Sequence, residues 1–139
     1  MKKIITILII LVTISCTTTS TTETETTPIV PKNVEIILST DRPEFDEIVV
    51  SYHDFETNTD LYGPRQFTYD SSGNQEPIII SLPDYSYSEI QGNAYRNNGL
   101  PYSLNAQIYI NDELKFEIED IGSAEAYATI FFDYTIIED

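Results

Sequence analysis

Residues 102–120 read YSLNAQIYINDELKFEIED, and this stretch decides the fold of the chain. Apolar and polar side chains alternate along both of its halves, which is typical of strands buried on one face. Asn111 and Asp112 separate the halves, and both residue types tolerate the positive φ of a two-residue hairpin turn. The stretch therefore predicts an antiparallel hairpin. We expect the following side chains to face inward: Leu104, Ala106, Ile108 and Ile110 in the first half, and Leu114, Phe116 and Ile118 in the second.

Alternation of the same kind recurs on both sides of this hairpin, and no segment of about ten residues or more carries a helical stripe. Further strands are expected at 34–38, 47–54, 66–70, 77–81, 84–92 and 126–137. Within 126–137 the inward face is expected to hold Ala126, Ala128, Ile130, Phe132, Tyr134 and Ile136. Because proline cannot donate to a strand ladder, we expect the prolines at strand starts or between strands: Pro43, Pro64, Pro77, Pro83 and Pro101. Short strands at this spacing predict an all-β, antiparallel sandwich of about seven strands over residues 33–139.

The first 15 residues have the anatomy of a secretory signal peptide. Lys2 and Lys3 form a basic start, and an apolar run follows from Ile4 to Ile14. This run is shorter than the about 20 residues that a membrane-spanning helix needs. Small Ser15 stands directly before Cys16, which is the only cysteine of the chain. An ordinary cleaved signal peptide with an incidental cysteine, or an uncleaved helical anchor, are the alternatives.

Residues 13–16, TISC, resemble the lipobox of bacterial lipoproteins. The resemblance implies cleavage after Ser15, a diacylglyceryl thioether on Cys16 and, in many bacteria, an added N-acyl chain. Thr13 stands where the family usually has leucine or another aliphatic residue. Two or more acyl chains anchor a protein stably to a membrane, whereas one chain is marginal. Thr17, in place of aspartate after the cysteine, implies by the same resemblance the outer membrane of the cell envelope.

The residues after Cys16 predict a tether that lies outside the core. Residues 17–27 consist only of threonine, serine and glutamate, and Pro28 and Pro31 follow them. Such a stretch has no apolar side chain to bury. As a flexible coil, the segment 16–32 would reach about 20 Å. The sequence thus divides into a signal peptide at 1–15, a lipidated and disordered tether at 16–32, and a folded domain at 33–139.

The charge of the chain limits its partners. Without Lys2 and Lys3 it carries 5 basic and 23 acidic residues, a formal net charge of −18. A field of this sign repels nucleic acids and anionic lipid head groups, so nucleic acid is excluded as a partner and any membrane association must come from something other than surface charge. The charge serves solubility, or it attracts divalent cations diffusely.

From Glu47 to Ile137 the order of features resembles the mycobacterial-membrane-protein-small family of MmpS-like transport accessory proteins and its Bacteroidetes lipoprotein relatives. The segments that carry the resemblance are VVSYHD at 49–54, ISLPDYSYSEIQGNA at 80–94, the stretch 102–120 and GSAEAYATIFFDY at 122–134. The usual hairpin glycine is absent at Asp112-Glu113, and the cysteine pair of the mycobacterial members is missing. The resemblance implies an immunoglobulin-like sandwich and an accessory role beside a lipid exporter.

Few residues suggest chemistry. His53 is the only histidine, and no nucleophile has a catalytic spacing to it. One histidine and a lipidated cysteine cannot complete a zinc site. Asp54, Glu56, Asn58 and Asp60 alternate like the first half of a calcium loop, but Thr59 replaces the glycine at the sixth place and Arg65 the glutamate at the twelfth. This segment is either a weak calcium site or a solvated acidic turn.

We therefore expect that the protein is not an enzyme and that it binds no cofactor. The favoured function is a membrane-anchored envelope lipoprotein whose acidic sandwich is a non-enzymatic interaction or accessory module for an envelope protein. The alternative is a small-ligand or carbohydrate-binding surface lipoprotein. Its candidate surface comprises the tyrosine-rich strands and the segment 91–103, which is expected as a loop. The aromatic rings of this surface either stack on sugars or a protein, or they pack the rims of the sheet.

Overall fold

The computed structural model describes residues 30–42 and 47–136. Ser15, Cys16 and the tether as far as residue 29 lie outside the described residues. The described part forms ten strands: β1 Lys32–Ser39, β2 Glu47–Asp54, β3 Thr59–Gln66, β4 Thr68–Tyr69, β5 Gln75–Glu76, β6 Ile78–Tyr85, β7 Glu89–Arg96, β8 Ser103–Ile110, β9 Glu113–Ile121 and β10 Thr129–Thr135.

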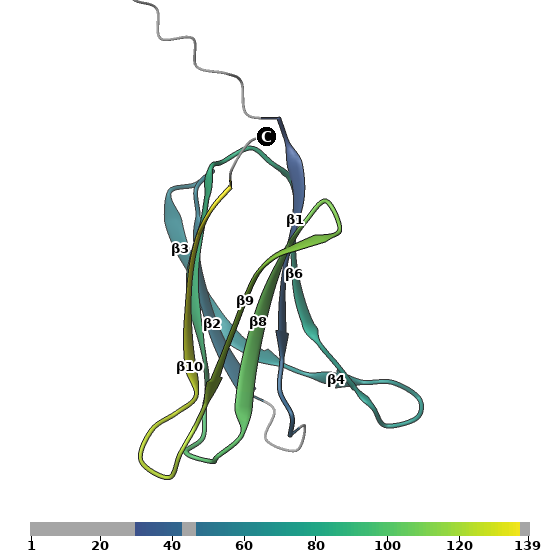
Figure 1. The fold of residues 1–139 in the computed structure, drawn as a ribbon, viewed down its shortest axis with the longest axis vertical. Coiled ribbons are helices and arrows are strands. Elements are labelled where there is room, and N and C mark those ends of the chain that lie inside the picture. The colour runs from purple at the N-terminus through teal and green to yellow at the C-terminus, as the bar shows by residue number, and fades with distance from the viewer. Residues whose placement is uncertain (1–29, 43–46, 137–139) are drawn as a thin grey trace, which may run out of the picture.

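The strands build a two-layer sandwich, as predicted. One sheet has the order β6-β1-β8-β9 and the other β10-β7-β2-β3, and every pairing is antiparallel. Strands β4 and β5 form a small hairpin that projects from the side of the sandwich (Figure 1). In immunoglobulin domains the second and third strands lie in opposite sheets, whereas β2 and β3 form a hairpin within one sheet. The likeness to that fold therefore lies in the sandwich architecture and not in the strand order.

The core lies between the two sheets and follows the alternation of the sequence. The predicted inward face of β8 is confirmed, since its four members are buried. Val34, Ile36 and Leu38 of β1 face them from the adjacent strand, and the second sheet closes the core from the other side. The main contributors from that second sheet are Ile48, Val50, Ile90, Ala94, Ile130 and Phe132.

Two expected core positions are wrong. Leu114 is 42% exposed, although Phe116 and Ile118 pack against the core. A register shift between Ile108 and Tyr109 pairs Leu114 with Tyr109, whose side chain faces outward, and a one-residue shift moves a side chain to the other face of a sheet. Ala126 is exposed because β10 begins only at Thr129.

The sequence-based strand boundaries fail where the chain changes sheets. The predicted single strand 84–92 is two strands, since β6 ends at Tyr85 and β7 starts at Glu89 in the opposite sheet. Half of the expected loop 91–103 is strand β7. Strand β3 was not predicted, because it is an exposed edge strand with few apolar residues. Pro64 and Pro83 lie inside β3 and β6, where an edge strand tolerates a missing N–H.

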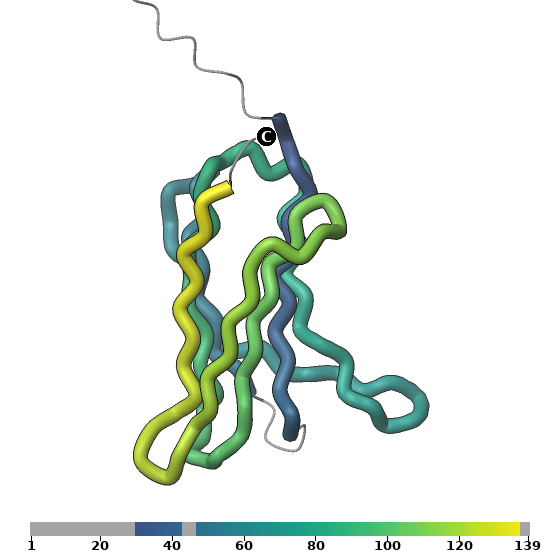
Figure 2. The backbone as a smooth tube through the Cα atoms, in the orientation of Figure 1, coloured from purple at the N-terminus to yellow at the C-terminus, as the bar shows by residue number. Residues whose placement is uncertain are grey.

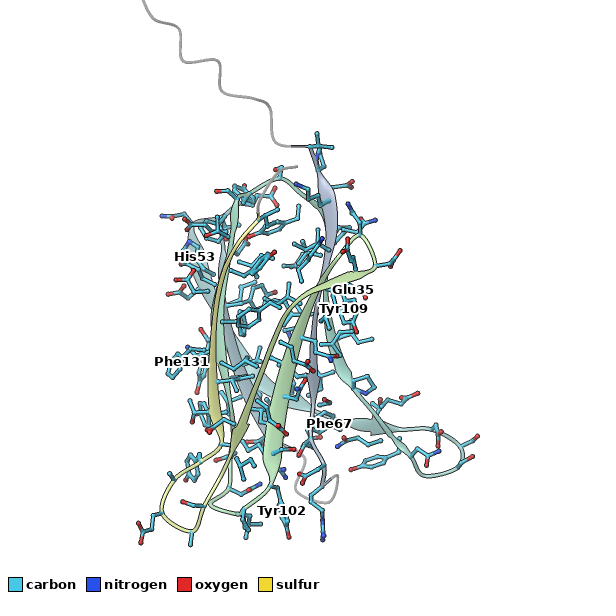
Figure 3. All side chains as sticks on the ribbon, in the orientation of Figure 1. Glu35, His53, Phe67, Tyr102, Tyr109 and Phe131 are labelled. Atoms are coloured by element: carbon cyan, nitrogen blue, oxygen red, sulfur yellow. The ribbon has the colours of Figure 1, made fainter. Side chains whose placement is uncertain are left out.

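A buried arginine closes one end of the sandwich. Arg96, at the end of β7, is 0% exposed and is the largest of the fully buried side chains. Its guanidinium donates to Thr40 Oγ1 and, at 3.1 Å each, to the carbonyl oxygens of Ser103 and Arg42. Its Cζ lies 5.3 Å from the centre of the Tyr102 ring, which marks this end in Figure 3. The Arg96 side chain thus joins the end of β7 to residues 40–42, which follow β1, and to Ser103, the first residue of β8.

The opposite end holds both ends of the described chain: β1 starts and β10 finishes there (Figure 2). The predicted β8–β9 hairpin turns at this end, with φ of 50° at Asn111 and 66° at Asp112. Asn33 and Asn111 fasten the turn to β1, because the Asn33 N–H donates to Asn111 Oδ1 at 3.0 Å and the Asn111 N–H donates to the Asn33 carbonyl oxygen at 2.8 Å.

Replacing Asp112 with glycine is expected to raise the free energy of unfolding by about 0.5 kcal/mol. Glycine removes the cost of holding a side chain at positive φ, and the larger entropy of its unfolded state offsets part of that gain. Urea denaturation of the parent and of Asp112→Gly measures the difference, with Asp112→Ala as the control that should lose stability. A loss of stability in Asp112→Gly would contradict the assignment of this turn.

Candidate functional site

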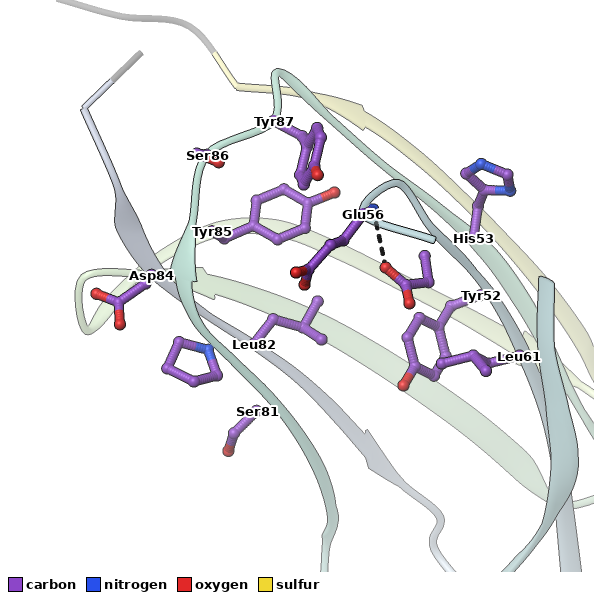
Figure 4. A pocket seen from close by; sticks show the side chains of 12 residues that line it. Tyr52, His53, Glu56, Leu61, Ser81, Leu82, Asp84, Tyr85, Ser86 and Tyr87 are labelled. Atoms are coloured by element: carbon purple, nitrogen blue, oxygen red, sulfur yellow. Dashed lines mark hydrogen bonds between the residues drawn. The ribbon is translucent and has the colours of Figure 1, made fainter. Parts of the chain in front are cut away.

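A cleft of about 520 Å³ opens between the end of the β2–β3 hairpin and strand β6. We call it the β2–β6 cleft (Figure 4). Its walls are mainly aromatic and aliphatic, and carboxylates and hydroxyls stand among them. The lining residues are Tyr52, His53, Asp54, Glu56, Leu61, Ser81, Leu82, Pro83, Asp84, Tyr85, Ser86 and Tyr87.

The cleft exists because this side of the sandwich is not closed by strand contacts. β3 and β6 are edge strands of opposite sheets, and each carries a proline that limits pairing. On the other side of the sandwich the edge strands β9 and β10 contact each other. The cleft also lies at the end where the chain enters β1, since Tyr85 pairs with Lys32.

Aromatic rings hold the upper wall of the cleft in place. Phe55 stacks on Tyr87 with ring centres 5.6 Å apart, and Tyr85 meets Tyr87 edge to face at 5.5 Å. The Tyr85 hydroxyl donates to the carbonyl oxygen of Glu89, the first residue of β7. Burial raises the pKa of Tyr85 to about 12, so this hydroxyl stays a neutral donor over the physiological range. The wall is therefore formed before any ligand binds.

The residues of the calcium hypothesis lie in the β2–β3 hairpin and are mostly engaged within it. Asp54 ends β2 and accepts hydrogen bonds from the Glu56 N–H at 2.9 Å and from Thr57 Oγ1 at 2.7 Å, and the Thr57 hydroxyl is the main cause that lowers the pKa of Asp54. Asp60 Oδ1 lies 2.8 Å from His53 Nδ1. Asn58 takes the left-handed position of the turn, with φ of 51°.

This hairpin does not gather its acidic groups around one point. Within residues 30–42 and 47–136, no three histidine, cysteine or acidic side chains are placed to hold a metal ion. Asp54 and Glu56 both line the cleft, and Figure 4 shows Glu56 directed toward Tyr85 and Leu82. The segment is therefore a capped turn in which Asp54 is engaged by hydrogen bonds of the turn and Glu56 presents its carboxylate to the β2–β6 cleft.

His53 and Asp60 form a carboxylate–imidazole pair on the outer face of the β10-β7-β2-β3 sheet, and Ser51 lies two residues away on the same face. A nucleophile must lie within hydrogen-bond reach of its base. The His53 ring instead meets Phe55 edge to face at 4.6 Å, and no hydrogen bond joins it to the Ser51 hydroxyl in the described part of the chain. This geometry is that of a structural pair and not of a catalytic triad.

A second depression lies on the same outer face. We call it the outer-face groove; its volume is about 460 Å³, and its lining side chains include Ser51, His53, Gln91, Asn93, Phe131 and Asp133. Gln91 and Asn93 belong to the segment 91–103 that the sequence predicted as a candidate binding surface, whereas Ser51, Phe131 and Asp133 were not predicted in a site. Alternation identifies which side chains face outward, but only the strand order brings residues from β10, β7 and β2 together. The sequence feature that could have indicated this site is Phe131, an exposed phenylalanine on a polar strand face.

No protein-family model matches this sequence, and no match was found among the curated proteins or the solved structures. In the part of the chain that the structure describes, no helix is long and apolar enough to cross a membrane.

Proposed function

We propose that this protein is a membrane-anchored envelope lipoprotein whose acidic β-sandwich is a non-enzymatic interaction module. Its β2–β6 cleft would receive a basic side chain, arginine or lysine, from an envelope protein partner. The observation that carries the proposal is the composition of the cleft: aromatic walls, the carboxylates of Asp54, Glu56 and Asp84, and no lysine or arginine among its lining residues.

Such a cleft suits a long cationic side chain. The methylene stem of lysine or arginine packs on apolar walls while its charged end seeks an acceptor. Tyrosine rings attract a cation over their faces, and Glu56 and Asp84 supply acceptors at the rim. Neither of these two carboxylates makes a side-chain hydrogen bond within the described residues, so both are available. The net charge of −18 would steer a basic partner toward this surface.

The position of the cleft fits a partner at the membrane. The cleft lies at the end of the sandwich where β1 begins, and the residues before β1 lead back to Cys16 in the sequence. A lipid on Cys16, with a tether of about 20 Å reach, would keep this end close to the membrane surface. An accessory role beside a membrane protein, which the resemblance to transport accessory proteins implies, agrees with that placement.

Neutralising the cleft is expected to reduce partner capture at least tenfold, which corresponds to about 1.4 kcal/mol. The variant is Glu56→Gln with Asp84→Asn. The matched control is Glu119→Gln with Glu125→Gln, two exposed acids away from the cleft that give the same change in net charge. Proteins captured from detergent-solubilised envelopes by parent and variants are quantified by mass spectrometry. Equal capture by both double variants would show that the cleft does not bind the partner.

Mass spectrometry of the mature N-terminus tests the anchor separately. We expect a chain that starts at Cys16 and carries two or more acyl chains. An unmodified Cys16, or a chain that still begins with Met1, would rule out the lipoprotein assignment.

A further inference from the structure

A row of side chains from four strands crosses the outer face of the β10-β7-β2-β3 sheet, and three of its members, Phe131, Asn93 and Ser51, line the outer-face groove. In the register of the sheet, Phe131 of β10 pairs with Asn93 of β7, Asn93 pairs with Ser51 of β2, and Ser51 pairs with Tyr62 of β3. Figure 3 shows Phe131 and His53 on the outer side of this sheet. The row therefore has an aromatic ring at each end and two small polar side chains between them.

The two rings are unusually open to solvent. Phe131 is 68% exposed and Tyr62 is 71% exposed, although both belong to strands of a folded sheet. Tyr62 is not isolated: its hydroxyl lies 3.4 Å from the hydroxyl of Tyr95, whose ring stacks on Tyr127 with ring centres 6.1 Å apart. Because Tyr95 pairs with Thr129 of β10 and with Val49 of β2, the three tyrosines lie alongside the row, and of its two end rings Phe131 is the one that lines the groove.

The floor of the groove has hydrogen-bonding groups that the described residues do not use. The side chains of Asn93 and Ser51 make no hydrogen bond within the described part of the chain, and both are only half-buried. Gln91, one row along, donates through Nε2 to Glu89 at 3.2 Å and to Asp133 at 3.4 Å, which leaves its carbonyl oxygen available. Amides and hydroxyls each offer donors and acceptors, as the hydroxyls of a sugar do.

The length of the row selects an extended ligand. Neighbouring strands lie about 4.8 Å apart, so three steps place Phe131 and Tyr62 about 14 Å apart at the backbone. This span exceeds a single sugar ring and suits a short oligosaccharide, whose flat apolar faces can pack on aromatic rings while its hydroxyls meet the amides between them. The small Ser51 and Asn93 keep the middle of the row low enough for such a chain to lie across it.

The charge of the groove selects a neutral ligand. Its lining holds no lysine or arginine, and Asp133 and the Asp60 paired with His53 lie along it. Uronic, sialylated or phosphorylated glycans would be repelled by these groups and by the overall charge. A protein partner is less suited to this surface, since the core of a protein interface is mainly apolar and depleted of charge.

From this geometry we propose that the outer-face groove is a binding site for a neutral oligosaccharide. Phe131 and Tyr62 are the stacking residues, and Asn93, Gln91 and Ser51 are the hydrogen-bonding residues. The site lies on the outside of the β10-β7-β2-β3 sheet and shares His53 alone with the lining of the β2–β6 cleft, so it does not depend on the proposed protein partner.

The test uses the full-length lipoprotein in a detergent without a sugar head group, because a glycosidic detergent would compete for the site. Isothermal titration calorimetry is carried out with a panel of neutral oligomers of glucose, mannose, xylose and N-acetylglucosamine, and with oligogalacturonate as the anionic probe. We expect at least one neutral oligomer to bind, its affinity to fall at least tenfold in both Phe131→Ala and Asn93→Ala, and oligogalacturonate not to bind.

The control is Tyr69→Ala, which removes an exposed ring outside this face and should leave the affinity unchanged. Unchanged thermal unfolding of Phe131→Ala and Asn93→Ala separates loss of binding from loss of fold. The proposal is overturned if no neutral oligomer binds, if the binding survives both groove variants, or if oligogalacturonate binds more tightly than the neutral oligomers. It is also overturned if Phe131→Ala abolishes capture of an envelope protein but leaves oligosaccharide affinity intact, since the groove would then be a protein-docking surface.

Discussion

Replacing Arg96 with alanine is expected to lower the free energy of unfolding by about 3–5 kcal/mol. Small domains are stable by about 5–15 kcal/mol, so the variant would be partly unfolded under mild conditions. Chemical denaturation followed by far-ultraviolet circular dichroism measures the change.

Two effects add up at this position. The substitution empties the space of a fully buried side chain, and it removes the guanidinium that donates to the Arg42 carbonyl oxygen, whereas the Ser103 carbonyl oxygen still accepts from Thr40 Oγ1 at 2.6 Å. An unsatisfied buried polar group costs about 1–3 kcal/mol, in addition to the cost of the cavity. The end of β1 and the start of β8 would lose a shared anchor, although Ser103 N–H still donates to Asp41 Oδ1 at 2.8 Å.

Arg65→Ala is the matched control, because Arg65 lies on the exposed edge strand β3. We expect it to change the free energy of unfolding by no more than about 0.5 kcal/mol, as is usual for surface positions. If the two arginine variants lost the same stability, the buried network around Arg96 would contribute nothing to the fold.

Phe132→Ala is expected to cost about 3–5 kcal/mol, whereas Phe131→Ala should stay within about 0.5 kcal/mol of the parent. The two residues are chemically identical neighbours on β10 that face opposite sides of the sheet. Phe132 is 1% exposed, and its ring lies over Gly92: a Cβ added at Gly92 would lie 2.4 Å from Phe132 Cζ. Phe131 faces the outer-face groove.

The free energy of unfolding of both variants is measured by denaturation in urea. Because the two variants have the same amino-acid composition, the difference between them depends only on the position of the substituted ring. A similar loss in both variants would mean that β10 does not present alternate faces to the core and to solvent. Since Phe131→Ala is also the main variant of the oligosaccharide test, its unchanged stability is required for that test to report on binding.

The comparison of Phe131 with Phe132 also shows which structural features the local sequence pattern can predict. Alternation predicted that Phe132 faces the core, and the β8–β9 hairpin was predicted from two residues that tolerate positive φ. Both signals are local, because the period of a strand and the geometry of a tight turn depend on neighbours in the chain. Where a local disturbance intervenes, as with the bulge that turns Leu114 outward, the pattern gives the wrong face.

Local sequence patterns alone could not assemble either candidate site. Asp54, Glu56, Asn58 and Asp60 were grouped by their spacing, but the hairpin assigns Asp54 to a turn and Asp60 to His53, and only the approach of β6 gives Glu56 a cleft to face. The segment that holds Arg96 was expected as a loop, and a charged residue near its middle gave no sign of burial. Its partners Thr40 and Arg42 lie 56 and 54 residues away in the chain, and Ser103 lies seven residues away.

The amino-acid sequence by itself determined the class of the fold, the β8–β9 turn, the inward face of most strands and the strongly acidic charge; it also predicts the lipid anchor at Cys16, which lies outside the described residues. The tertiary structure decided the order of strands in each sheet, the burial of Arg96, the open side between β3 and β6, and the row from Phe131 to Tyr62. The physical reason is that alternation states only whether a side chain faces in or out. Which strands become neighbours, and in which register, depends on pairings between residues far apart in the chain, and those pairings create both proposed binding surfaces.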